Sequence, residues 1–293
     1  MELTRGAREW QSKGEADRYR GHRIHVFERD GSDPLLMLLH GFPSSSYDWR
    51  AVLEHEPEHA VLALDFLGFG LSSKPRDHVY SLLWQADLVE DLLRRRPSAR
   101  AVFIVAHDMG TSVATELMAR DLEGRLDVEL AGALLFNGSI VLERASLTSA
   151  QRLLRSRMGM LFALLSNERV FRQQFGALFS PQHPLDSQEA ADQWSLICNN
   201  GGRTLGHRLI HYLDERERYA ERWHGAVRDW EGPLSLAWGL QDPVATTAVL
   251  DALIELRPGV PVDRLSGLGH YPQLEDPAAI VAALHGALER TAA

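Results

Sequence analysis

The chain has 293 residues, of which 45% are hydrophobic and 24% charged, an ordinary composition for a globular protein with a large core. Its formal net charge of −9 disfavours nucleic acids and anionic membranes as partners, because both repel an acidic surface. The single cysteine, Cys198, excludes an intrachain disulfide, and the first residues lack the apolar core of a signal peptide. No apolar run approaches the ~18 residues of a membrane span, so we expect a cytoplasmic protein.

Buried strands and helices alternate through the first half of the chain. After a mostly polar start, residues 23–27 predict an edge strand. Continuous apolar runs then predict four strands buried on both faces, at 35–39, 60–64, 101–105 and 130–136. Helical spacing of apolar residues predicts helices at 81–95 and 112–120. This alternation is typical of a mostly parallel sheet with helices on both faces.

Residues 139–230 interrupt the pattern. No further buried strand is predicted there, and helical runs occupy 150–165 and 205–223. The alternation then resumes, with predicted strands at 234–239 and 260–265 and predicted helices at 247–256 and 278–288. We therefore predict an α/β core made of residues 1–138 and 231–293, with residues 139–230 inserted as a helical unit.

Asp108 lies in a turn between a predicted strand and a predicted helix. Ala106 and Gly110 flank it at minus two and plus two, which gives the small-x-nucleophile-x-small pattern of a nucleophile elbow. Small residues are needed because the chain must turn sharply there. The following helix N-terminus favours a negative charge on Asp108. An ordinary strand–helix turn with a capping aspartate is the alternative.

Two further ionisable residues follow later strands, in the order Asp108, Asp242, His270. Loops at the carboxyl ends of parallel strands share one edge of the sheet, so the three side chains can converge. A carboxylate nucleophile forms an ester that must then be hydrolysed. A neutral histidine can activate the water, and a second carboxylate can orient that histidine. This order of nucleophile, acid and histidine is the one used by hydrolases of this architecture.

The turn at 40–43, His-Gly-Phe-Pro, follows the strand predicted at 35–39. We expect it to bring the backbone N–H of Phe42 opposite that of Met109. Two such donors form an oxyanion hole.

Four segments together resemble the α/β-hydrolase superfamily: 39–43, the Asp108 turn, 242–244 and 269–270. The aspartate nucleophile narrows the resemblance to the branch of epoxide hydrolases and haloalkane dehalogenases. Longer stretches, at 40–49, 63–70 and 270–277, resemble the mesoderm-specific transcript subgroup of that branch. The resemblance spans nearly the whole chain. It implies that residues 139–230 form a helical cap over the active site and that Phe42–Pro43 is a cis bond.

The chain departs from the dehalogenase pattern at its halide donors. Those enzymes usually have Trp where this chain has Met109, and often Asn where it has Phe42, and neither side chain here can donate. Epoxide hydrolases instead protonate the epoxide oxygen with cap tyrosines. The cap contains Tyr212 and Tyr219, seven residues apart and able to share a helix face. We prefer Tyr212 as the acid that protonates the epoxide oxygen. The alternative is that Tyr212 only packs against other side chains of the helix.

The sequence thus predicts an Asp-nucleophile hydrolase that converts an epoxide to a diol. The catalytic residues would be Asp108, Asp242, His270 and Tyr212, and Tyr219, Asn137 and Trp194 would contact a small apolar organic substrate. No cofactor or metal is implied, because no residues have ligand spacing. The alternatives are a haloalkane dehalogenase with an atypical halide site and a non-catalytic ligand-binding protein on the same fold.

Overall fold

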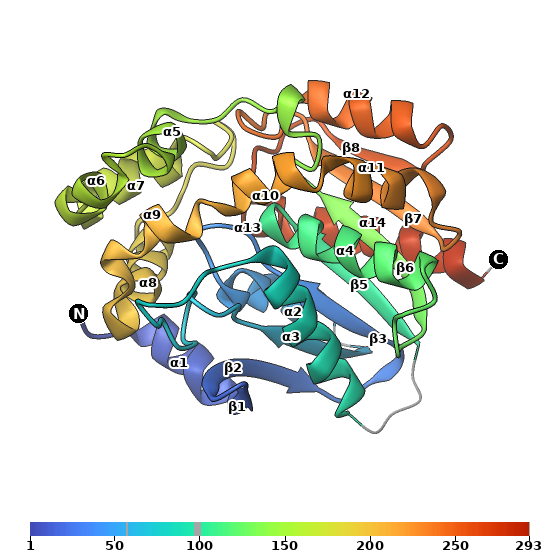
Figure 1. The fold of residues 1–293 in the computed structure, drawn as a ribbon, viewed down its shortest axis with the longest axis horizontal. Helices are drawn as coiled ribbons and strands as arrows, with labels where there is room; N and C mark the ends of the chain where they lie inside the picture. The colour runs from blue at the N-terminus through green and yellow to red at the C-terminus, as the bar shows by residue number, and fades with distance from the viewer. Residues whose placement is uncertain (57, 97–100, 293) are drawn as a thin grey trace.

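One eight-stranded sheet forms the centre of the computed structural model, which describes residues 1–56, 58–96 and 101–292 (Figure 1). The strands are β1 (Glu15–Tyr19), β2 (His22–Arg29), β3 (Ser32–Leu39), β4 (His59–Leu64), β5 (Val102–His107), β6 (Leu130–Phe136), β7 (Leu234–Gly239) and β8 (Val262–Leu265). Their order is β1-β2-β4-β3-β5-β6-β7-β8, antiparallel at β1–β2–β4 and parallel from β4 to β8. The predicted mostly parallel α/β sheet is confirmed.

Alternate side chains of the central strands enter two separate cores. In β3, Met37 and Leu39 join one cluster, whereas Leu36 and Leu38 join the other. Neither set is exposed to water, which explains why the central parts of these strands are continuous apolar runs.

Helices cover both faces of the sheet. The first core lies under α3 (Leu82–Arg94), α4 (Met109–Leu122), α11 (Ala220–Asp229) and α12 (Thr247–Leu256). The second lies under α1 (Arg5–Lys13), α2 (Arg50–His55) and α14 (Pro277–Ala292). None of the helices in the described ranges is long and apolar enough to cross a bilayer.

The inserted segment is helical, as predicted. It contains α5 (Ser149–Arg155), α6 (Gly159–Leu165), α7 (Glu168–Gly176), α8 (Ser187–Cys198), α9 (Gly206–Leu209) and α10 (Tyr212–Arg218) before α11. Figure 1 shows α5–α9 grouped beside the sheet, whereas α11 lies along α4 on the core. Short 3₁₀ helices occur at η1 (Ser46–Trp49), η2 (Leu142–Arg144) and η3 (Asn199–Thr204), and α13 (Pro272–Glu275) precedes the last helix.

Three details of the predicted fold are wrong. The strand at 23–27 belongs to β2, which is not an edge strand because β1 pairs with its outer side. The run at 205–223 is divided among α9, α10 and α11. The run at 150–165 is divided into α5 and α6 at Ser156, whose hydroxyl donates to Leu153 O and accepts from Met158 N, so it competes with the helix.

Candidate active site

Asp108 occupies the turn between β5 and α4 in a strained conformation, with φ of 43° and ψ of −110°. A β-carbon added to Gly110 would lie 2.5 Å from Leu39 O and 2.8 Å from His40 O. Only glycine therefore fits at plus two without moving the neighbouring strand end. Positive φ in a non-glycine residue costs about 1–3 kcal/mol, and such positions cluster at functional sites. The local geometry is that of a nucleophile elbow.

The two carboxylate oxygens of Asp108 have different surroundings. Oδ2 accepts a hydrogen bond of 2.9 Å from the backbone N–H of Phe42, as the predicted oxyanion arrangement requires. Met109 follows directly as the first residue of α4, so its N–H has no partner within the helix. The Phe42–Pro43 bond is cis, as the resemblance implied. The other carboxylate oxygen, Oδ1, lies on the side of Asp108 that faces a positively charged side chain.

That cation is Arg216, which sequence reasoning missed. Its Nη2 donates to Asp108 O at 2.8 Å and lies 3.6 Å from Asp108 Oδ1, while its Nε donates to Ser112 Oγ at 2.8 Å. Burial opposes ionisation of Asp108, but the charges of Arg216 and the nearby histidines, with the Phe42 bond, lower its pKa below the ordinary value. Arg216 is 1% exposed, and its Nη1 is buried without a hydrogen-bond partner in the described part of the chain.

Tyr212 lies one helical turn before Arg216 on α10. The guanidinium carbon is 4.7 Å from the centre of the Tyr212 ring, and that ring is 5.8 Å from the ring of Phe42. Its hydroxyl is buried and faces the Arg216 guanidinium, which can only donate, so no acceptor for the hydroxyl proton lies among the described residues. Burial, with the charge of Asp108, raises the pKa of Tyr212, so the hydroxyl keeps its proton and offers a free donor. The i, i+4 spacing puts Arg216 on the same face of α10 as Tyr212.

Asp242 and His270 are hydrogen-bonded, as the predicted triad requires. His270 Nδ1 lies 2.7 Å from Asp242 Oδ2, so Nδ1 donates and Nε2 carries the lone pair in the neutral ring. Asp242 Oδ1 accepts from the N–H groups of Val244 and Ala245 at 2.7 and 3.0 Å. Burial lowers the pKa of His270, but the charge and hydrogen bond of Asp242 outweigh it and raise that pKa above the ordinary value.

Asn137 supports the acid from the end of β6. Its Nδ2 donates to Asp242 Oδ2 at 2.7 Å and its Oδ1 accepts from Gly239 N at 2.9 Å. It is fully buried and absent from the cavity wall. The structure therefore places Asn137, predicted as a substrate contact, beside Asp242 instead.

His107 supports His270 from behind and was not predicted. Its Nε2 donates to His270 O at 2.7 Å, and its Nδ1 accepts from Gln273 Nε2 at 3.1 Å. Burial lowers the pKa of His107 to about 3, so this ring is neutral and fixed in one tautomer. It holds the backbone of His270 and adds no competing charge.

A cavity of about 260 Å³ reaches Phe42 and His270, whereas Asp108 and Tyr212 are not among the residues that line it. Phe42 and His270 form its inner end, and its outer walls come from the inserted segment, including Phe162, Phe175 and Trp194. Trp194 thus lies where a substrate contact was predicted. Tyr219 does not, because it is half-buried against Trp223, 5.6 Å between ring centres, and lines no part of this cavity.

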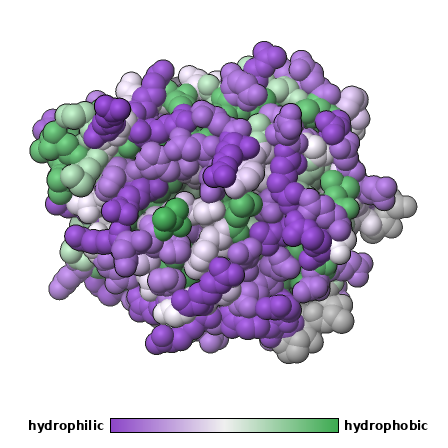
Figure 2. Space-filling model, in the orientation of Figure 1, coloured by the Kyte–Doolittle hydropathy of each residue, from purple (hydrophilic) through white to green (hydrophobic). Residues whose placement is uncertain are grey.

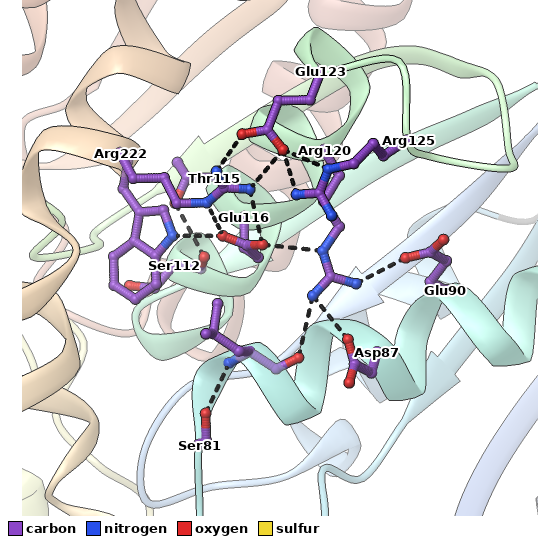
Figure 3. A network of polar contacts seen from close by, with 12 residues as sticks. Ser81, Asp87, Glu90, Ser112, Thr115, Glu116, Arg120, Glu123, Arg125 and Arg222 are labelled. Atoms are coloured by element: carbon purple, nitrogen blue, oxygen red, sulfur yellow. Dashed lines mark hydrogen bonds and ion pairs between the residues drawn. The ribbon is translucent and has the colours of Figure 1, made fainter.

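A buried ion network fixes α11, which directly follows α10, to α4 (Figure 3). Glu116 of α4 accepts from Arg222 Nε at 2.7 Å, from Trp223 Nε1 at 3.0 Å and from Arg120 Nε at 3.0 Å. Arg120 also bonds Asp87 and Glu90 of α3. The helix that carries Tyr212 and Arg216 therefore leads into one bonded firmly to the core.

No three His, Cys, Asp or Glu side chains within 1–56, 58–96 and 101–292 are grouped so that they could hold a metal ion. Asp108, with Phe42 N–H and Arg216 beside it, and the hydrogen-bonded Asp242–His270 pair instead lie close enough for their charges to influence one another. Such an arrangement can form and hydrolyse an ester on Asp108.

Comparison with known proteins gives a consistent result. The model of the Alpha/beta hydrolase family matches residues 36–283. "Putative hydrolase LipZ" of Mycobacterium tuberculosis is 54% identical over 93% of this chain and 94% of its own length. The human mesoderm-specific transcript homolog protein is 36% identical over 97% and 88%. The crystal structure of haloalkane dehalogenase DbeA from Bradyrhizobium elkani matches with a TM-score of 0.79 at 24% identity, over 95% and 98%, which shows a shared fold.

Proposed function

The chain belongs to the alpha/beta hydrolase family and is a hydrolase, and from that premise we propose that it opens an epoxide through a covalent ester on Asp108. The proposed substrate is a small apolar organic epoxide, because aromatic and aliphatic side chains dominate the cavity wall. The product would be the corresponding diol.

In the first half-reaction, Asp108 Oδ1 attacks an epoxide carbon. Its lowered pKa keeps the carboxylate ionised at neutral pH, and Phe42 N–H holds Oδ2, so that Oδ1, 3.6 Å from Arg216 Nη2, is the oxygen without a hydrogen bond. The ring C–O bond breaks as the new ester bond forms. The hydroxyl of Tyr212 protonates the departing alkoxide, and the positive charge of Arg216 stabilises the tyrosinate that remains.

In the second half-reaction, His270 Nε2 takes a proton from water, and the resulting hydroxide attacks the ester carbonyl carbon. Negative charge develops on Oδ2, where the N–H groups of Phe42 and Met109 stabilise it. Asp242 stabilises the imidazolium. Collapse of the intermediate breaks the bond to Oδ1, and the leaving alkoxide takes the proton of the hydroxyl that came from water, so the diol leaves with Oδ1 and the Asp108 carboxylate keeps one oxygen from water. The proton held by the His270 imidazolium returns to the Tyr212 tyrosinate, which restores both residues.

The observation that carries the epoxide assignment is the free hydroxyl of Tyr212. A buried donor without a partner costs about 1–3 kcal/mol, so its retention next to the Asp108 site calls for a ligand that accepts its hydrogen bond. An epoxide oxygen is such an acceptor, and it needs a proton as the ring opens.

One observation favours the dehalogenase alternative. The indole of Trp194 lines the cavity, and its N–H makes no hydrogen bond within the described residues, so it could hold a leaving halide. Met109 and Phe42 still provide no side-chain donor. A non-catalytic binding protein is the less favoured alternative, because it would have no use for a strained aspartate aligned with a base and an oxyanion donor.

The test separates the two half-reactions. In His270→Gln protein, attack by Asp108 should proceed while hydrolysis stops, so a reactive epoxide should accumulate as an ester. Intact-protein mass spectrometry should show one added substrate mass with no atoms lost. A matched chloroalkane should react more slowly, and adding Tyr212→Phe should slow epoxide trapping by roughly 10²–10⁴-fold.

Asp108→Asn in the same background is the control and should abolish the adduct. A faster reaction with the chloroalkane would favour the dehalogenase. If neither substrate class gives an adduct while both bind reversibly, the protein is a binding protein and the catalytic assignment is wrong.

A further inference from the structure

An apolar patch covers the outside of α5 and α6. Six of the nine large hydrophobic side chains exposed in the described residues lie between 153 and 165, with exposed fractions from 38% to 69%. They are Leu153, Met158, Met160, Leu161, Leu164 and Leu165. Figure 2 shows hydrophobic residues gathered at the upper left of the molecule, where Figure 1 places α5–α7. A patch of this kind on a monomer marks a surface that binds something.

Arginines surround this cap patch, the six side chains just named. Residues 149–173 contain five arginines and one acid, Glu168, in a chain whose net charge is −9, and of these arginines Arg155 is paired with Asp214 and Glu217 outside the segment. Arg157 precedes Met158, Arg169 is the second residue of α7, and Arg203 donates to the carbonyls of Leu164 and Ser166 at the end of α6. All three are exposed, and none forms an ion pair among residues 1–56, 58–96 and 101–292. The net charge of the whole chain therefore conceals a local cationic region.

The cap patch is separated from the active site by one layer of helix. The inner faces of α5 and α6 supply Leu154, Phe162 and Ala163 to the wall of the cavity that ends at Phe42 and His270. An apolar molecule held at the cap patch would therefore lie one helix away from the reacting groups.

We propose that the cap patch docks this enzyme onto an anionic lipid surface. Apolar side chains enter the acyl boundary while Arg157, Arg169 and Arg203 contact lipid phosphates, the arrangement of an interfacial helix with a basic rim. A second copy of the chain fits less well, because a symmetric contact would bring the two arginine rims face to face. Docking does not depend on the epoxide reaction. It would supply apolar substrate from the lipid phase, contrary to the expectation drawn from net charge.

The test is flotation of the purified full chain with vesicles of phosphatidylglycerol or phosphatidylcholine. We expect binding to the anionic vesicles, weakened by salt, and at least tenfold weaker binding to the neutral ones. Met160→Glu with Leu165→Glu should reduce binding at least tenfold, since it puts charge into the two most exposed side chains of the patch. Arg157→Gln with Arg169→Gln should reduce it about fivefold per arginine.

Matched controls lie outside the cap. Val79→Glu changes a side chain that is 82% exposed, and Arg18→Gln with Arg264→Gln changes exposed arginines on the edge strands β1 and β8. Neither control should alter vesicle binding. Failure to float with anionic vesicles, or equal loss in the controls, would overturn the proposal. A dimer in light scattering that Met160→Glu with Leu165→Glu dissociates, without vesicle binding, would assign the cap patch to a second copy instead.

Discussion

Glu116→Ala should cost the protein about 3–4 kcal/mol of unfolding free energy. The carboxylate is 3% exposed and accepts four hydrogen bonds, two from Arg222 and one each from Trp223 and Arg120 (Figure 3). Truncation leaves Arg120 bonded to α3 and Arg222 bonded to Glu123, but the buried indole N–H of Trp223 keeps no partner.

The magnitude follows from these partners. An unpaired buried donor costs about 1–3 kcal/mol, and breaking a buried ion pair costs about 3–5 kcal/mol. The estimate lies at the low end because both arginines keep other carboxylates. Glu123→Ala is the matched control, since it removes a carboxylate from the same Arg222 at an exposed position and should cost less than about 1 kcal/mol.

Urea unfolding monitored by tryptophan fluorescence gives both values, and pH provides a second check. Burial raises the pKa of Glu116, but the bonds from Arg222, Trp223 and Arg120 outweigh it, so the folded-state pKa lies below the ordinary 4.5. The stabilisation is therefore fully present above 4.5 and is lost as the pH falls through the lower folded-state value. Equal small losses for Glu116→Ala and Glu123→Ala would refute the claim that this network fixes α11 to α4.

Two further predictions concern charge. Arg216→Met removes the cation beside Asp108 and so raises the pKa of that carboxylate. In the His270→Gln background, the pH at which the rate of Asp108 alkylation falls on the acidic side should therefore become higher. If that pH does not change, the charge of Arg216 does not influence the ionisation of Asp108. Burial raises the pKa of Asp48 from 3.8 to about 7, so the folded state holds a proton that the unfolded state releases and stability falls between those pH values. Asp48→Asn should thus gain stability relative to the natural protein as the pH rises from 3.8 to about 7, and a pH-independent difference in urea midpoints over that range would contradict this.

The sheet could be predicted from the sequence because burial on both faces leaves a simple pattern. β6 and β7 have the predicted bounds, because both are apolar runs interrupted only by Ser235. The first two elements, α1 and β1, were not predicted because each buries only a few side chains, such as Trp10 in α1 and Tyr19 in β1. The contacts that stabilise them come from distant residues, including the bond from Trp10 to Ser46, which local periodicity cannot indicate.

The site was predictable where chemistry depends on chain order. Asp108, Asp242 and His270 each follow a strand, and the structure brings Asp242 and His270 to 2.7 Å. Arg216 was missed because an arginine in a polar helix usually faces water, and only tertiary packing buries it. The direction in which the Asn137 amide points could not be predicted from the sequence either, since a polar residue after a strand can face the cavity or the neighbouring loop.

The proposed reacting groups and most of the cavity wall come from different parts of the chain. Asp108, Asp242 and His270 follow strands of one sheet, and Tyr212 and Arg216 lie on a helix that leads into the α11–α4 network. The outer wall comes from α5–α8, which contribute nothing to the triad. Substitutions in α5–α8 can therefore change which substrates fit the cavity during evolution while the proposed catalytic residues stay the same. Related enzymes of this kind would then diverge faster in the substrates they accept than in the reaction they catalyse.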